Sequence, residues 1–87
     1  MIVWVTRAEH LGGYSLWLEF SDGIVGKVDL SDRLRGEIFE PLRDPDYFSK
    51  FVLDEQHDTP TWPNGADFAP EFLRERVIAA ASEVAEP

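Results

Sequence analysis

The sequence predicts an α+β fold: a mostly antiparallel sheet of about five strands, with one short helix and one long C-terminal helix packed on it. Two observations carry this prediction. Residues 14–20 and 24–30 alternate apolar and polar side chains with the period of a half-buried strand. From Pro70 to about Val84, apolar residues recur at helical spacing instead. We expect residues 1–87 to form a single domain, because a chain of 87 residues provides one modest core.

The two alternating segments are joined by Ser21-Asp22-Gly23, and the register of their pairing can be derived. A two-residue loop would place the charge of Lys27 opposite the core residue Leu18. A three-residue loop with a left-handed Gly23 keeps apolar residues opposite one another. Because a slip of one residue turns every side chain to the wrong face, we expect the longer loop. The predicted pairs are Phe20 with Ile24, Leu16 with Val28, and Tyr14 with Leu30.

The same register places Trp17 opposite Lys27 on the face of the sheet that points away from the core. A cation beside an indole ring favours a cation–π contact, so we predict one between these two side chains. Exposed aromatic residues among polar ones are typical anchors in protein interfaces. Trp17 and Lys27 are therefore candidate binding residues.

The remaining elements are less regular. Ile2 to Arg7, Lys50 to Leu53 and Thr59 to Trp62 are rich enough in β-formers to be strands. Asp44-Pro45 is an N-cap followed by proline, which predicts a short helix through Phe48. Within the long final helix, an apolar stripe faces the core, and part of it is long enough to serve a partner or a second copy. The stripe comprises Leu73, Val77, Ala80 and Val84.

The segment Thr61 to Glu71 predicts a strand-to-helix corner. Pro63 keeps Trp62 extended, and Asn64-Gly65 supplies positive-φ positions for a tight turn. Asp67 is then placed to cap the final helix. This structural interpretation has a functional alternative, in which Trp62, Asn64 and Asp67 bind a polar small molecule or a peptide.

The charge and composition exclude several kinds of function. The chain has 17 acidic and 8 basic side chains, for a net charge of −9. Such a surface repels phosphate backbones, so we expect no direct binding to nucleic acid. The acidity serves either solubility or attraction to a basic protein partner. No segment is apolar enough to span a membrane, and no basic-then-apolar leader is present, so we expect a cytoplasmic protein without membrane contact.

Residues for catalysis or metal binding are sparse. The chain has no cysteine, and its two histidines, His10 and His57, are far apart in sequence. The acidic cluster of Asp54, Glu55 and Asp58 lacks the spacing of a calcium loop. No serine lies in a nucleophile elbow, and no glycine-rich loop could hold a phosphate. We therefore predict no catalytic residues, no metal and no cofactor.

The order of short motifs resembles a family of short bacterial proteins known as domain of unknown function 2442. The motifs are Phe20-Ser21-Asp22-Gly23, Val28-Asp29-Leu30, Phe39-Glu40-Pro41-Leu42, Trp62 to Asp67, and Ala69-Pro70-Glu71. The resemblance covers about Val3 to Leu73. It implies a small α+β domain with an antiparallel sheet and no established catalytic activity. It also implies an antitoxin-like or regulatory role. Some relatives carry a helix-turn-helix domain after this one, for which we expect no room before Pro87.

The leading functional hypothesis is a non-catalytic protein-interaction or regulatory module, antitoxin-like in its sharpest form. Its contact surface would be the outer sheet face with Trp17 and Lys27, the corner near Trp62, or the final helix. The alternative is a small-molecule-binding protein or a weak enzyme centred on Asn64 and Asp67. A third hypothesis is a homodimer formed through the final helix or an unpaired strand edge.

Overall fold

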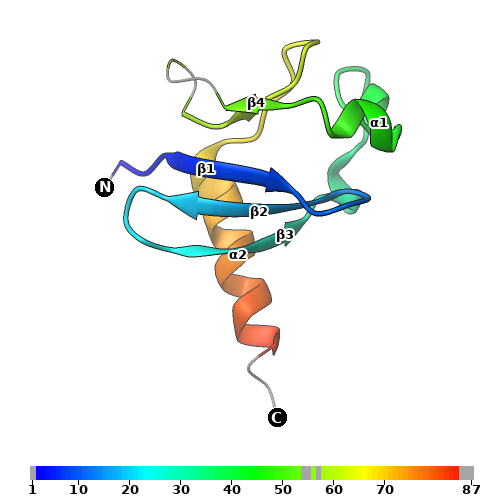
Figure 1. Cartoon of the computed structure of the whole chain (residues 1–87). Coiled ribbons are helices and arrows are strands. Elements are labelled where there is room, and N and C mark those ends of the chain that lie inside the picture. The colour runs from blue at the N-terminus through cyan, green and yellow to red at the C-terminus, as the bar shows by residue number, and fades with distance from the viewer. Residues whose placement is uncertain (1, 54–55, 57, 85–87) are drawn as a thin grey trace.

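The computed structural model describes residues 2–53, 56 and 58–84, and for residues 81–84 the backbone alone. It confirms the predicted α+β class, with the strands divided between two antiparallel sheets (Figure 1). The larger sheet has the order β1-β2-β3, and the smaller pairs β4 with β5. In chain order the elements are β1 (Val5–His10), β2 (Ser15–Phe20), β3 (Val25–Asp29), the 3-10 helices η1 (Ser31–Arg33) and η2 (Glu40–Arg43), α1 (Pro45–Phe48), β4 (Val52–Leu53), β5 (Pro60–Thr61) and α2 (Pro70–Val84).

The β2–β3 hairpin has the predicted register. Leu16 pairs with Val28. At the loop, the backbone N–H of Phe20 donates to the carbonyl of Ile24 at 2.8 Å. Gly23 is left-handed, with φ of 93°. Apolar pattern and turn chemistry thus agree on one register, which brings Leu16, Leu18 and Phe20 to the buried face.

Strand β1 starts later and ends later than predicted, at Val5 and His10 rather than Ile2 and Arg7. Pairing with β2 sets its end, because Glu9 lies opposite Trp17 and His10 opposite Leu16. The register shifts at Thr6, between the Val5–Phe20 and Arg7–Glu19 pairs. Such a bulge lets Val5 point into the core while Arg7 points outward. The two short strands, β4 and β5, also cover less of the chain than predicted.

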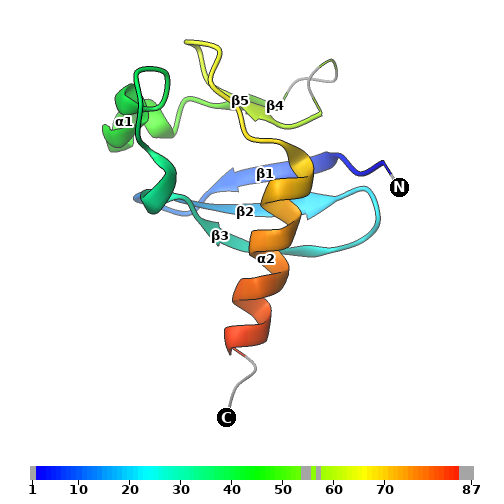
Figure 2. The ribbon, with the colours of Figure 1, turned by 180° about the vertical axis from the view of Figure 1, so that it is seen from behind.

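Helix α2 spans the predicted residues and covers one face of the larger sheet. It crosses β2 and β3, and its C-terminal end runs past β3 (Figure 2). Leu73 and Val77 are buried against the sheet. Gly26 of β3 lies directly under the helix, since a Cβ atom built there would be 2.7 Å from Cγ1 of Val77. The absence of a side chain at this position therefore permits the close approach of helix and sheet.

Two arginines of α2 form ion pairs with segments that flank β3. The Arg74 Nε donates to Oδ2 of Asp22 in the hairpin loop at 2.7 Å. Partial desolvation raises the pKa of Asp22, but the hydrogen bond and charge of Arg74 outweigh it, and the net pKa lies below its ordinary value. Arg76 pairs with Asp32 of η1. Exposed pairs of this kind contribute little stability, and their role is orientation.

Trp62 is the centre of the aromatic part of the core. Its indole is 2% exposed, and Nε1 donates to the carbonyl of Phe48 at 2.7 Å. Its ring lies 5.4 Å from Phe48, 5.9 Å from Phe51 and 5.9 Å from Phe68, between ring centroids. The N-cap predicted for α1 is confirmed, because Asp44 Oδ1 accepts from the N–H of Asp46 at 3.0 Å. The segment around α1 and η2 therefore packs on the end of the sheet through this cluster.

The face of the larger sheet opposite α2 is left open by the described elements (Figure 1). We call this the outer sheet face and describe its side chains below. Among the described residues, no helix is both long and apolar enough to cross a membrane.

We predict that Gly26→Ala lowers the free energy of unfolding by about 1–3 kcal/mol, because the new methyl group collides with the stiff, buried side chain of Val77. Urea denaturation would measure the loss. The matched control is Lys27→Ala on the outer face of the same strand, which should be close to neutral. In a Val77→Ala background the cost of Gly26→Ala should shrink, and equal costs in both backgrounds would contradict the proposed contact.

Candidate functional site

The corner after β5 is a tight turn. The N–H of Gly65 donates to the carbonyl of Trp62, and the N–H of Trp62 donates to that of Ala66, both at 2.9 Å. Gly65 has φ of 89°, whereas Asn64 is not left-handed, so the prediction of two positive-φ residues is wrong at Asn64. The reason is that Pro63 and Asn64 occupy the central positions of the turn, and only the residue that leaves it needs the left-handed region.

The side chain of Asn64 is occupied by backbone groups at both ends of its amide. Oδ1 accepts from the N–H of Ala66 at 3.1 Å, and Nδ2 donates to the carbonyl of Ile38 at 2.8 Å. The second bond joins the corner to the loop before η2. Trp62 is buried in the core. In this structure Asn64 and Trp62 therefore connect parts of the fold: the Trp62 indole donor is used inside the core, and the Asn64 amide makes one bond at each end.

Asp67 does not cap α2, so this prediction is wrong. The helix begins at Pro70, and the first N–H bond of its ladder runs from Leu73 to the carbonyl of Ala69. Asp67 instead forms an isolated antiparallel bridge with Thr61. Burial of the intervening Phe68, whose carbonyl accepts from Thr59 Oγ1 at 2.7 Å, keeps the chain extended past the predicted cap. The exposed Asp67 carboxylate has no hydrogen bond with any described residue.

Asp67 opens instead onto a pocket of about 460 Å³ between the segment after β3 and the start of α2. We call it the Arg–Phe pocket. Its lining residues come from three stretches of the chain: Asp32, Arg33 and Arg35; Phe39; and Asp67, Phe68, Ala69 and Phe72. Of these residues, the sequence predicted only Asp67 as a binding residue. The pocket therefore exists only because the fold brings distant segments together.

One wall of the pocket is a row of three phenylalanine rings. Phe39 stacks on Phe68 with centroids 4.9 Å apart and an interplanar angle of 22°. Phe68 stacks on Phe72 at 5.8 Å and 23°. The guanidinium of Arg33 lies 4.7 Å from the Phe72 ring centroid, and that of Arg76 lies 5.5 Å from it. Aromatic surface and cationic groups are thus in direct contact at this site.

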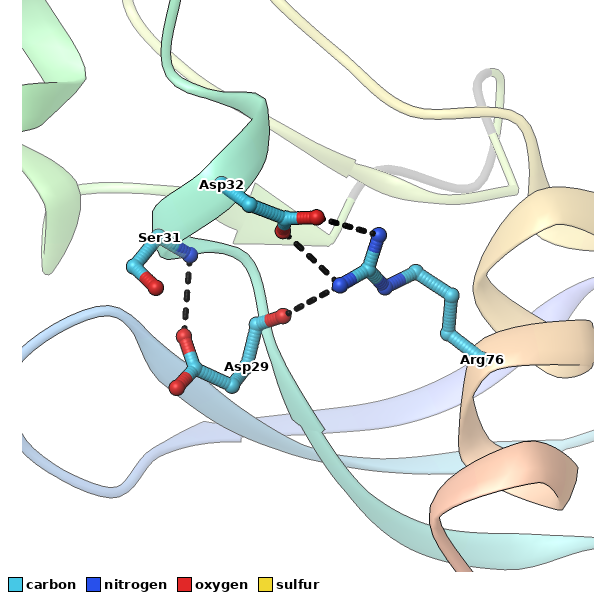
Figure 3. Close-up of polar contacts among 4 residues, drawn as sticks. All are labelled: Asp29, Ser31, Asp32 and Arg76. Atoms are coloured by element: carbon cyan, nitrogen blue, oxygen red, sulfur yellow. Dashed lines mark hydrogen bonds and ion pairs between the residues drawn. The ribbon is translucent and has the colours of Figure 1, made fainter.

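The charge of Arg76 is matched by Asp32 (Figure 3). Nη2 of Arg76 lies 2.8 Å from Oδ1 of Asp32, and Nη1 lies 3.2 Å from Oδ2, a two-pronged geometry. Nη2 also donates to the carbonyl of Asp29 at 3.2 Å, while Asp29 Oδ1 accepts from the N–H of Ser31 at 2.9 Å. The hydrogen bond from Arg76 outweighs partial desolvation and lowers the pKa of Asp32 below its ordinary value. Asp32 therefore stays ionised at neutral pH.

Neither Arg33 nor Arg35 forms a salt bridge with a described carboxylate, although the charge of Arg33 helps to lower the pKa of Asp32. Both are exposed, and they flank the buried Leu34. With Arg76 paired to Asp32, the pocket has two arginines and the single remaining carboxylate of Asp67, an excess of one positive charge in a chain whose net charge is −9. The sequence did hold a signal for them, because two arginines on either side of a core leucine must point away from the core together.

Trp17 and Lys27 pair across β2 and β3 as predicted. The cation over the Trp17 ring, however, is Arg7, whose guanidinium carbon lies 5.6 Å from the centroid. Arg7 reaches the ring diagonally, since its direct partner on β2 is Glu19 and that of Trp17 is Glu9. Trp4 is 44% exposed and Val25 is 51% exposed. Strand alternation places Val25 on the outer sheet face with Trp17, and Trp4, just before β1, lies between the buried Val3 and Val5 and so points away from the core, which gives that face an apolar component.

No group of three or more His, Cys, Asp or Glu side chains within the described ranges is placed to hold a metal ion. Of the acidic loop considered above, Asp54, Glu55 and His57 lie outside the described residues.

We predict that Asn64→Ala lowers the free energy of unfolding by about 1–2 kcal/mol, because it removes two hydrogen bonds to backbone groups. Asp67→Ala should change it by less than about 0.5 kcal/mol, because its carboxylate caps nothing. The two variants, compared by urea denaturation, control for one another. A loss at Asp67 as large as that at Asn64 would contradict this assignment.

Comparison with known proteins adds two findings, while a search of curated proteins finds no match. The first finding is a similarity to the crystal structure of Putative DNA Binding Protein NE0471 from Nitrosomonas europaea ATCC 19718. The sequence identity is 32% and the TM-score 0.66. The match covers 98% of this chain and 52% of that one, so the chain spans about half the length of this neighbour.

The name of this neighbour contradicts our expectation that nucleic acid is not bound directly. That expectation rested on the net charge of −9, which is a property of the whole chain. Net charge does not describe a local surface, and the Arg–Phe pocket shows that cationic groups gather on this one.

The second finding concerns the family. The model of the family described as "Protein of unknown function (DUF2442)" matches residues 5–79. This range contains all of the motifs that carried the resemblance, together with every element from β1 to the greater part of α2. The chain therefore belongs to the DUF2442 family.

Proposed function

We propose that this chain is a non-catalytic binding module of a regulatory kind, and that its Arg–Phe pocket receives a small ligand with an anionic group, a carboxylate or a phosphate. The observation that carries the proposal is the position of Arg33 and Arg35. Both line an open pocket with a phenylalanine wall, and neither is paired with a carboxylate among the described residues. A guanidinium without a partner at an aromatic surface is suited to a carboxylate or a phosphate, because its planar donors match two acceptor oxygens.

The size and lining of the pocket support this proposal. A volume of about 460 Å³ falls within the range of about 300–1,000 Å³ that is usual for small-molecule sites. Such sites combine apolar walls with a few polar groups that orient the ligand. Here the walls are Phe39, Phe68 and Phe72, and the orienting groups are arginines and Asp67.

The same lining supports a role without catalysis. The pocket contains no histidine, lysine or hydroxyl side chain that could act as a base or nucleophile. Of its two carboxylates, Asp32 is held ionised by Arg76 and is therefore a poor proton donor near neutral pH. The other carboxylate, Asp67, has no second titratable side chain of the opposite role beside it in the lining, and this supports binding over acid–base catalysis.

The location of the pocket supports regulation. A ligand there would bridge the segment after β3 and the start of α2, two parts of the chain that are distant in sequence. Binding would favour the arrangement in which both contact the ligand, which is how a ligand shifts a conformational equilibrium.

We predict that benzoate, titrated into ¹⁵N-labelled protein, shifts the amide signals of residues 32–39 and 67–72. Benzamide, which has the same ring and no charge, should produce much smaller shifts. Arg35→Gln should weaken benzoate binding about tenfold, the effect of losing one charge-assisted hydrogen bond. Arg43→Gln, at an exposed arginine that does not line the pocket, is the matched control. Shifts elsewhere, or unchanged binding to Arg35→Gln, would refute the site.

A second candidate function, protein docking, is favoured by the outer sheet face. Trp4 and Val25 are exposed there, beside the half-buried Trp17 and the side chains of Arg7 and Lys27. This is the interaction-module role expected from the sequence, and an antitoxin would be one form of it. Such a protein would present this face to its toxin.

For this role we predict that the product of the neighbouring gene co-purifies with the wild-type chain after co-expression, and that Trp17→Ser abolishes the association. Trp17 is half-buried and pairs with Lys27 outside the buried core, so the variant should remain folded, which circular dichroism would verify. Lys50→Ser, at another exposed position away from the outer face, is the control. Equal recovery of the partner by Trp17→Ser would exclude this face as the docking surface.

A further inference from the structure

We propose that the ligand of the Arg–Phe pocket is a free aromatic amino acid, bound as its zwitterion. This inference rests on the proposed function, since it assigns a chemical class to the ligand of the same site. It follows from three features of the pocket: the balance of its charges, the position of Asp67, and the arrangement of the three phenylalanine rings.

The first feature is the charge that remains once the internal ion pair is accounted for. Arg76 is bound on both prongs by Asp32 and is not free for a ligand (Figure 3). Arg33 and Arg35 remain, one of them held over the Phe72 ring. Two cationic groups suit one carboxylate. A dianionic phosphate would bring a second negative charge close to Asp32 and Asp67, where no third free arginine offsets it.

The second feature is the free carboxylate of Asp67. The backbone bridge with Thr61 places this residue at the pocket, and its side chain has no hydrogen bond with a described residue. A purely anionic ligand would be repelled by it. A ligand that carries an ammonium group as well as a carboxylate would instead be bound at both ends, the carboxylate by Arg35 and Arg33 and the ammonium by Asp67. Opposite charges on one pocket therefore favour a dipolar ligand.

The third feature is the phenylalanine wall. Phe39, Phe68 and Phe72 form a row with neighbouring centroids 4.9 and 5.8 Å apart and nearly parallel planes. An aromatic side chain can extend such a row by offset stacking or edge contact, at centroid distances of about 4.5–7 Å. A short aliphatic side chain would cover much less of this surface. The pocket thus offers one site for each part of an aromatic amino acid.

The test is isothermal titration calorimetry on the 87-residue chain with L-phenylalanine and three analogues that each lack one part of it. The analogues are 3-phenylpropionate, without the amine; 2-phenylethylamine, without the carboxylate; and L-alanine, without the ring. Each should bind at least about tenfold more weakly than phenylalanine, because each loses one charge-assisted contact or the aromatic contact. Adenosine monophosphate is included as the dianionic alternative and should bind more weakly as well.

Two pocket variants then test which residue binds each end of the ligand. Asp67→Asn should weaken phenylalanine about tenfold and leave 3-phenylpropionate unchanged or tighter, since it removes the partner of the amine and the repulsion of the carboxylate. Arg35→Gln should weaken both ligands and leave 2-phenylethylamine unchanged. Arg43→Gln, outside the pocket, should change none of them. Because the Asp67 carboxylate has no hydrogen bond with a described residue, Asp67→Asn should fold normally.

The outcomes separate the two proposals. If 3-phenylpropionate binds as tightly as phenylalanine and Asp67→Asn affects neither, the zwitterion inference is wrong while the anion-binding pocket stands. Tighter binding of adenosine monophosphate than of phenylalanine would likewise refute the zwitterion inference and leave the anion-binding pocket standing. If no carboxylate or phosphate binds in a manner that depends on Arg35, both proposals fail.

Discussion

The burial of Trp62 is the constraint on which the rest of this structure depends. Its indole N–H is satisfied inside the core by the carbonyl of Phe48, at 2.7 Å. That one bond joins the corner after β5 to the end of α1, while the ring contacts Phe48, Phe51 and Phe68. A buried indole donor without a partner would be costly, so the two segments must meet in this arrangement. Phe68 is thereby held extended, α2 starts at Pro70, and Asp67 is left at the surface.

The Arg–Phe pocket is a consequence of the same arrangement. Phe68 contacts Trp62 edge-on and Phe39 face to face, so a single ring belongs both to the core and to the pocket wall. The Asn64–Ile38 bond holds the loop before η2 against the corner, and the Arg76–Asp32 pair holds η1 against α2. The wall and the cationic segment are thus positioned by contacts that lie beside the pocket, which leaves Arg35 and Asp67 available for binding.

Local patterns predicted those parts of the fold that depend on neighbours in sequence. The alternation of residues 14–30, with Gly23 in the loop, determined one hairpin register because any other would bury charge. Helix α1 begins at Pro45 after the Asp44 cap, and α2 begins at Pro70, both as predicted. Predictions failed where a partner distant in sequence decided the outcome. Pairing with β2 carried β1 on to His10, and packing of Phe68 kept the chain extended beyond Asp67, so that this residue does not cap α2.

By itself, then, the sequence determined the α+β class, the hairpin register, both helices and the family, because periodicity and turn chemistry act over a few residues. Only the tertiary structure decided which polar side chains are free. The sequence predicted Asn64 as a binding residue, whereas in the fold its amide bonds to Ile38 and Ala66. It did not predict Arg33 and Arg35, which the fold places beside Phe39, Phe68 and Phe72. The physical reason is that a binding site is made of unsatisfied groups that converge in space. Whether a polar group is satisfied can depend on a contact far away in sequence, such as the Asn64–Ile38 bond, which spans 26 residues.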